Sequence, residues 1–163
     1  MYSLKEINEV MRMDTPRHRI EHFDMSHFDQ IDLNDHDKKV LISFPNYRDY
    51  IRTFAEYGVA FTAIGDEQLY ALFGVFPLWE GVAEAWLMPS KDINRKTIAM
   101  HRASLKFFEY YAEKNSLKRL QFTVHSLNFH AVMWAKRCYF VCEGRLKNYG
   151  PDGNDHFMFA RYF

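Results

Sequence analysis

Short hydrophobic runs with strand character fill the middle of the chain. Residues 59–64 and 68–76 are apolar and are separated by the turn sequence Gly65-Asp66-Glu67, which predicts an antiparallel hairpin. Residues 77–81 are predicted to form a second turn, and a third apolar run over residues 82–88 ends at Pro89. These runs predict a meander of three strands.

A long amphipathic segment follows this meander. Its apolar positions repeat on one helical face while most charged positions lie outside it, which predicts a helix that ends at Asn115-Ser116. Residues 120–125 alternate apolar and polar side chains, as a half-buried strand does. Residues 128–137 are predicted to form a short helix. Residues 139–146 and 156–163 are predicted to form a final hairpin around a loop at 148–154.

The first 58 residues carry weaker patterns. Leu4, Ile7 and Met11 stand at helical spacing and predict a helix over residues 4–12. A second helix is predicted from Asn46 to Gly58, with its apolar side chains on one face. Residues 31–37 are polar and are predicted to be a loop. For residues 13–45 as a whole, helices, a first strand or both remain open.

The predicted order of elements is a helical N-terminus, three strands, a helix, a strand, a helix and two strands. This order indicates a mixed α/β (α+β-like) sheet with helices on its faces. The length of 163 residues predicts one domain over residues 1–163, with the sheet in residues 59–163.

Composition narrows the possible partners. Acidic and basic residues balance at 21 each, so no electrostatic footprint indicates a nucleic acid or a membrane surface as partner. The first six residues lack the apolar core of a signal peptide. Cys138 and Cys142 would lie about 13 Å apart on one strand, too far to bridge, and are predicted to be reduced, buried thiols. These features favour a cytoplasmic location.

The C-terminal quarter resembles a known family. One motif is similar to the Asn-x-x-Ala-x-x-Leu-Tyr-x-Lys-x-Gly-Phe pattern of the Gcn5-related N-acetyltransferases (GNAT): it comprises Asn128-x-x-Ala131-x-x-Trp134 and Arg137-x-Tyr139-Phe140. The Glu143-Gly144 pair and the end of the predicted strand at Leu87-Met88-Pro89 also resemble that family. The resemblance implies a GNAT-type, mostly antiparallel sheet of six to seven strands, flanked by about four helices. It also implies acetyl-coenzyme A as cofactor and no metal.

The resemblance implies a set of cofactor-binding residues. A Gln/Arg-x-x-Gly-x-Gly/Ala loop of the family wraps the pyrophosphate, because bare backbone N–H groups at a helix N-terminus must approach the phosphates. Here Thr97 carries a branched Cβ where glycine is usual, and the charged pair before it either attracts phosphate or is simply solvated. The expected cofactor-binding residues are Trp86, Leu87, Met88, Asn94, Arg95, Lys96, Thr97, Ala99, Asn128 and Arg137.

Two positions in the motif depart from the family. Ala135 replaces the tyrosine that often protonates the leaving thiolate of coenzyme A, and alanine cannot donate a proton. Tyr139 replaces a glycine that usually ends the helix in a left-handed conformation, which costs a tyrosine about 1 kcal/mol. We therefore expect the helix to end differently here.

Two residues are candidates for catalysis. Transfer of an acetyl group to an amine needs a base and donors for the oxyanion. Glu84 is expected on the same strand face as Trp86 and is either a base acting through water or an exposed strand glutamate. His125 ends the next strand and is either a base or acid, or a cap for the following helix. Asn128 either caps that helix alone or also binds the ligand.

A metal site is a weaker possibility. His18 and His22 stand at i and i+4 and would share one face of a helix, but no further ligands accompany them. No Walker loop, Rossmann glycines or zinc-finger spacing is present in the sequence.

Two functional classes follow. The first is an acyl-coenzyme-A-dependent N-acetyltransferase that acts on a small-molecule or protein amine. The second is a catalytically inactive GNAT-fold protein that binds protein partners or self-associates. A similarity to short GNAT-like phage proteins linked to virion assembly would place it in the host cytoplasm or the virion. Fold alone does not separate these classes.

Overall fold

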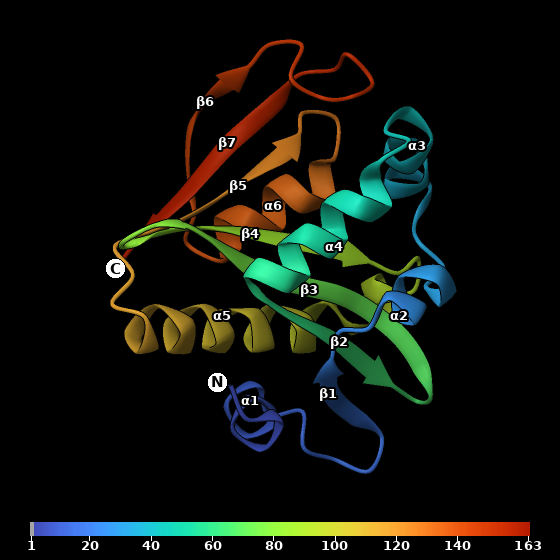
Figure 1. The fold of residues 1–163 in the computed structure, drawn as a ribbon, viewed down its shortest axis with the longest axis vertical. Coiled ribbons are helices and arrows are strands. Elements are labelled where there is room, and N and C mark those ends of the chain that lie inside the picture. Colours follow the sequence, from blue (N-terminus) through green and yellow to red (C-terminus); the bar gives the residue numbers. More distant parts are fainter. Residues whose placement is uncertain (1) are drawn as a thin grey trace.

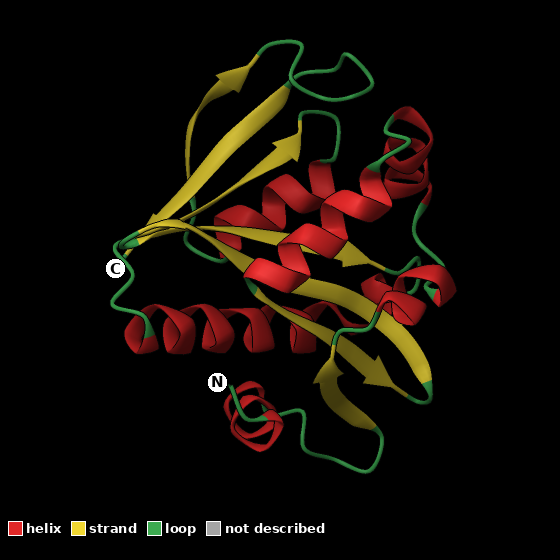
Figure 2. Ribbon diagram, in the orientation of Figure 1, coloured by secondary structure: helices red, strands yellow, loops and turns green. Residues whose placement is uncertain are grey.

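The computed structural model describes residues 2–163 and shows a sheet covered by helices on both faces (Figures 1 and 2). In chain order the elements are α1 (Leu4–Met11), β1 (His18–His22), α2 (Met25–Gln30), α3 (Asp35–Ser43), α4 (Tyr47–Tyr57), β2 (Val59–Gly65), β3 (Gln68–Trp79), β4 (Val82–Pro89), the 3₁₀-helix η1 (Ile93–Lys96), α5 (Thr97–Lys114), β5 (Arg119–His125), α6 (Phe129–Arg137), β6 (Val141–Leu146) and β7 (His156–Tyr162).

The sheet has seven strands in the order β1-β2-β3-β4-β5-β7-β6. Neighbouring strands in the sheet run antiparallel, except for β4 and β5, which run parallel. That parallel pair extends over only three positions, and the last joins Glu84 to Gln121. Beyond it the two strands continue without pairing and part from each other (Figure 1).

Two hydrophobic cores hold the helices on the two faces. Helices α1, α5 and α6 cover one face around Phe107, Leu120 and Phe159. On the other face, α4 packs through Ile51 against Leu72 and Met88, and Figure 2 shows α4 crossing over the strands. Side chains of β4 alternate between these cores, because successive residues of a strand point to opposite faces.

The structure confirms a mixed α/β fold with a mostly antiparallel sheet of seven strands. The predicted meander, the long helix, the short helix and the final hairpin are all present. The predicted turn over residues 77–81 was too long, because β3 continues to Trp79 and pairs there with Val82. Within residues 2–163 there are six α-helices rather than about four. The additional helices lie in residues 13–45, which form the strand β1 as well as α2 and α3.

The prediction of a loop over residues 31–37 was wrong at its end, because α3 begins at Asp35. The Asn34 side chain accepts hydrogen bonds from the backbone N–H groups of His36 and Asp37, both at 3.0 Å. A polar run that begins with a good N-cap residue is therefore the first turn of a helix here, not a loop.

His18 and His22 are the two ends of β1 and do not share a helix face. Residues four apart in a strand are separated by about 13 Å, too far for one metal ion. Within residues 2–163, no group of three or more His, Cys, Asp or Glu side chains is arranged to hold a metal. No helix in that range is both long and apolar enough to cross a membrane.

The end of α6 corrects a second expectation. Tyr139 itself adopts the left-handed conformation, with φ 65°, so the helix ends as it does with glycine. The Phe140 N–H donates to the Ala135 carbonyl and the Tyr139 N–H donates to that of Lys136, which is a Schellman motif. Arg161 lies 5.6 Å from the centroid of the exposed Tyr139 ring and offsets part of the strain.

Both cysteines are free thiols, as predicted. Cys138 is buried, and burial raises the pKa of its thiol to about 12. Cys142 is exposed on β6, so the expectation that both thiols are buried was wrong. Within residues 2–163, the strand β6 forms an edge of the sheet.

Candidate functional site

Glu84 stands at the point where β4 and β5 part. It points to the α4 side of the sheet, because Ala83 and Ala85 beside it belong to the opposite core. Burial raises the pKa of the Glu84 carboxyl, and a hydrogen bond from the Gln121 side chain opposes this rise. The phenol of Tyr50 on α4 faces this region, and its own burial raises its pKa to about 12. A partly desolvated carboxylate of this kind is suited to accept a proton near neutral pH.

The Trp86 side chain turns away from β5. Its indole lies over Gly74 of β3, so that a methyl group on Gly74 would come within 2.7 Å of the indole Nε1. The ring also meets Phe23 edge-on, with the centroids 5.9 Å apart. Beside it, Leu87 packs into the α5 core and Met88 into the α4 core. The backbone of β4 beyond Glu84 is thereby left next to the parted edge.

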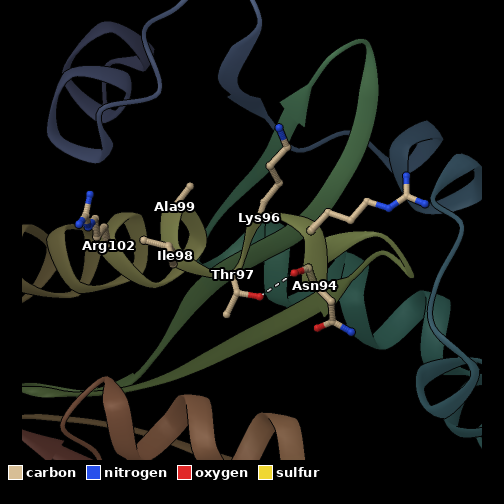
Figure 3. A pocket seen from close by; sticks show the side chains of 7 residues that line it. Asn94, Lys96, Thr97, Ile98, Ala99 and Arg102 are labelled. Carbon is tan, nitrogen blue, oxygen red and sulfur yellow. Dashed lines mark hydrogen bonds between the residues drawn. The ribbon is translucent and has the colours of Figure 1, made fainter.

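The N-terminus of α5 borders an open pocket of about 460 Å³, formed entirely by η1 and the first turns of α5. No side chain caps this helix end, and its first turn contains no acidic residue, so its positive end is unopposed. The pocket is lined by Asn94, Arg95, Lys96, Thr97, Ile98, Ala99 and Arg102 (Figure 3). An uncapped helix N-terminus flanked by arginines is suited to bind phosphate.

Within this pocket the expected residues differ in where they point. The Thr97 hydroxyl donates to the Asn94 carbonyl at 2.8 Å, and Lys96 extends away from both (Figure 3). The Lys96 ammonium lies 3.4 Å from the Asp66 carboxylate and 3.3 Å from His18 Nε2. The Arg95 side chain is 78% exposed. Lys96 is thus held by the β2–β3 turn, while Arg102, which the motif does not include, lines the pocket.

His125 is buried at the end of β5, with both ring nitrogens bonded to protein groups. Its Nδ1 accepts the Leu127 N–H at 3.1 Å, and its Nε2 lies 3.0 Å from Asp152 Oδ2. The His36 ring of α3 meets the His125 ring edge-on, with the ring centroids 4.4 Å apart. These contacts of His125 connect α3, β5 and the β6–β7 loop. For His125 to act as a base, its ring nitrogen would first have to give up its bond to Leu127 or to Asp152.

The remaining motif residues lie on α6. The Asn128 side chain caps the helix by accepting the Ala131 N–H at 3.1 Å. Arg137 is the last residue of the same helix, about 13 Å along its axis from Asn128. Ala135 is fully buried. Trp134 packs on the same core, against Phe122 of β5.

The structure therefore brings the predicted site residues into separate groups. Glu84 lies where β4 and β5 part, the residues of η1 and α5 surround the pocket beyond the end of β4, and Arg137 lies at the far end of α6. The sequence motifs missed Tyr50, Gln121 and Arg102. Strand alternation places Gln121 on the same face as His125, so that signal was available in the sequence.

Comparison with known proteins identifies the class of fold. The chain matches RimL, a ribosomal L7/L12 alpha-N-protein acetyltransferase solved with coenzyme A, at a TM-score of 0.67 and 14% identity, over 91% of this chain and 96% of that one. A GNAT family acetyltransferase from Elizabethkingia anophelis with acetyl-coenzyme A bound matches at a TM-score of 0.68 and 13% identity, over 91% of this chain and 100% of that one. An IAA acetyltransferase from Bacillus cereus matches at a TM-score of 0.67 and 12% identity, over 90% of this chain and 99% of that one.

These similarities show that the chain is a divergent protein with the GNAT fold. The sequence itself matches no protein-family model and no curated protein. At such low identity the likeness extends to the fold and not to the activity, which has to be argued from the site.

Proposed function

We propose that this protein is an acyl-coenzyme-A-dependent N-acetyltransferase that acts on an amine. The observation that carries the proposal is the parting of β4 from β5 directly after Glu84. It leaves a backbone edge of β4 unpaired between a carboxylate and the uncapped N-terminus of α5. Structural neighbours with coenzyme A or acetyl-coenzyme A bound support the choice of cofactor.

The pocket at the α5 N-terminus fits a phosphate-bearing cofactor. Backbone N–H groups of the first turn and the Arg95 and Arg102 side chains would hold the pyrophosphate, with Asn94 and Thr97 beside them. Lys96 would contribute only at long range, since Asp66 already holds it. Acetyl-coenzyme A would supply the acetyl group as a reactive thioester.

Glu84 would then act as the base. Its carboxylate takes a proton from the acceptor ammonium, directly or through water, and frees the nitrogen lone pair for attack on the acetyl carbon. Unpaired N–H groups of β4 beyond Glu84 would stabilise the oxyanion. As the carbon–sulfur bond breaks, the attacking nitrogen would release its second proton to solvent and the thiolate would leave. Ala135 is buried and has no proton to give, so the thiolate would take its proton from solvent.

The identity of the acceptor amine is the finer part of the proposal. RimL is described as acting on the ribosomal protein L7/L12, and a relative of the same fold acts on an N-terminal serine of that protein. A protein N-terminus is therefore one acceptor to test beside small-molecule amines.

A turnover assay tests the catalytic role. Release of free thiol from acetyl-coenzyme A is measured with a pool of N-terminal peptides and small amines, for the wild type and for Glu84→Gln. We expect the substitution to lower kcat by about a hundredfold or more while cofactor binding stays intact. Equal turnover by the two proteins would remove Glu84 from the mechanism.

The alternative is a GNAT-fold protein without catalysis, including a phage virion or assembly component. Two observations favour it: Ala135 offers no acid, and both nitrogens of His125 are already bonded. Light scattering after size-exclusion chromatography distinguishes the two classes. A defined oligomer without affinity for acetyl-coenzyme A supports the alternative, and a monomer that binds acetyl-coenzyme A counts against it.

A further inference from the structure

A row of polar side chains crosses the sheet from its β6 edge to Glu84. On β6, Glu143 accepts two bonds from the Arg119 guanidinium, at 2.8 Å to Oε1 and 2.5 Å to Oε2. On β5, the Arg119 Nε donates to the Gln121 Oε1 at 2.8 Å. Gln121 is paired in register with Glu84 of β4. The row thus connects an exposed edge of the sheet with the candidate base.

Strand β7, which lies between β5 and β6, leaves room for this row. Ala160 is paired with Gln121 and Tyr162 with Arg119. The Tyr162 hydroxyl donates to Glu143, and the Arg119 guanidinium lies 5.8 Å from the centroid of the Tyr162 ring. The small Ala160 and the flat Tyr162 ring let the long Arg119 side chain reach across β7.

The chemistry of the row fixes the orientation of the Gln121 amide. A guanidinium carries only donors, so the amide oxygen of Gln121 must face Arg119. The amide NH₂ is then left at the end toward Glu84, where it can only donate. Glu143, held by Arg119 and Tyr162 with a pKa lowered to about 2, stays ionised and keeps Arg119 in place.

Two influences on the ionisation of Glu84 oppose each other. Burial disfavours the charged carboxylate and raises its pKa, while the Gln121 side chain favours the charged form and lowers the pKa. The Tyr50 phenol on α4 remains neutral, and the Phe76 side chain opposite on β3 is apolar. Within the described residues the strand partners of Glu84 are the apolar Phe76 and the neutral Gln121, so the Gln121 amide is the polar group that favours the carboxylate in this partly dry position.

We propose that Arg119 and Gln121 are positioning residues for Glu84, with Arg119 orienting the amide of Gln121 so that its NH₂ holds the carboxylate in its ionised form. This inference rests on the proposed function for its catalytic meaning. Its physical content, a dependence of Glu84 ionisation on two residues that never touch a substrate, is measurable without any turnover.

The test is an NMR titration of the whole protein labelled with ¹³C at the glutamate carboxyl, with the Glu84 signal assigned by its loss in Glu84→Gln. Gln121→Leu removes the donor, and we expect the Glu84 pKa to rise by about one unit. Arg119→Met keeps an unbranched apolar stem without the guanidinium, which frees the Gln121 amide to rotate, and we expect a smaller rise in the Glu84 pKa. Arg145→Met is the matched control, because Arg145 is an ion-paired strand arginine as well, but it lies on the edge strand β6 and pairs with Asp155, away from Gln121.

An unchanged Glu84 pKa in folded Gln121→Leu overturns the inference, as does a shift in Arg145→Met as large as in Arg119→Met. If Arg119→Met does not fold, Gln121→Leu decides alone, since a half-exposed strand position accepts leucine. In an active enzyme the acid limb of the pH–rate profile moves upward by the same amount. A shifted Glu84 pKa without any acetyl transfer would leave the positioning role standing and refute the proposed activity.

Discussion

Replacement of Gly74 by alanine should destabilise this fold strongly, for a reason visible at one point of the sheet. Gly74 lies between Ala60 of β2 and Trp86 of β4. A Cβ at this position would stand 2.2 Å from the Val59 carbonyl oxygen and 2.7 Å from the Trp86 Nε1. The first contact is with backbone, so it cannot be relieved by a change of rotamer.

The magnitude follows from overpacking in a rigid environment. Forcing a methyl group into a filled site costs about 1–3 kcal/mol. We expect the upper end, about 3 kcal/mol, because relief requires both a shift of β2 and a movement of the Trp86 ring from its contact with Phe23. Gly144→Ala is the matched control, since a Cβ there meets nothing within 4 Å. It should change stability by less than about 0.5 kcal/mol.

Urea denaturation followed by tryptophan fluorescence and circular dichroism measures both variants against the wild type. A displaced Trp86 would also shift toward the parted edge of β4, so we expect weaker binding of acetyl-coenzyme A by folded Gly74→Ala. If Gly74→Ala is within about 1 kcal/mol of Gly144→Ala, the close packing of the indole over β3 is wrong.

Three further predictions concern stability. Burial raises the pKa of Asp37 from 3.8 to about 6, so Asp37→Asn should stabilise the protein by about 2 kcal/mol above pH 6. The gain should shrink as pH falls from 6 and vanish below about pH 3, where the carboxyl is protonated in both folded and unfolded chains, and urea denaturation at pH 3 and pH 8 checks this sign. Tyr139→Gly should be about 1 kcal/mol more stable than Tyr139→Ala, because both lose the ring but only glycine tolerates the left-handed conformation; equal midpoints would contradict the helix end described here. Ala135→Tyr should lower the thermal midpoint of unfolding without raising turnover, because this fully buried position has no room for a tyrosine. A variant that is as stable as the wild type and more active would contradict this.

The sequence predicted the regular half of this fold well, because its strands and long helix carry clear periods of two and 3.6 residues. The N-terminal part was harder. The strand β1 contains four charged or histidine side chains among five residues, so its pattern carries little hydrophobic signal. Helix α3 was missed because its polar first turn resembles a loop until Asn34 is recognised as a cap.

The site was predictable only where local patterns decide orientation. Alternation along β4 correctly placed Glu84 on the face of Trp86. The attachment of Lys96 to Asp66 depends on contacts between distant segments, which no local motif reveals. The bond between Arg119 and Glu143 requires β7 to lie between β5 and β6, and a hairpin pattern does not show which of its strands joins the sheet.

We propose that the parted strands β4 and β5, with the α5 N-terminus, bind acetyl-coenzyme A. Isothermal titration calorimetry of the full chain with acetyl-coenzyme A measures this binding. Arg102→Glu serves as the pocket variant, and Arg145→Met leaves the pocket untouched. We expect one site per chain with micromolar affinity for the wild type and Arg145→Met, and an affinity at least about tenfold weaker for Arg102→Glu. Absence of binding heat at millimolar acetyl-coenzyme A would contradict this proposal.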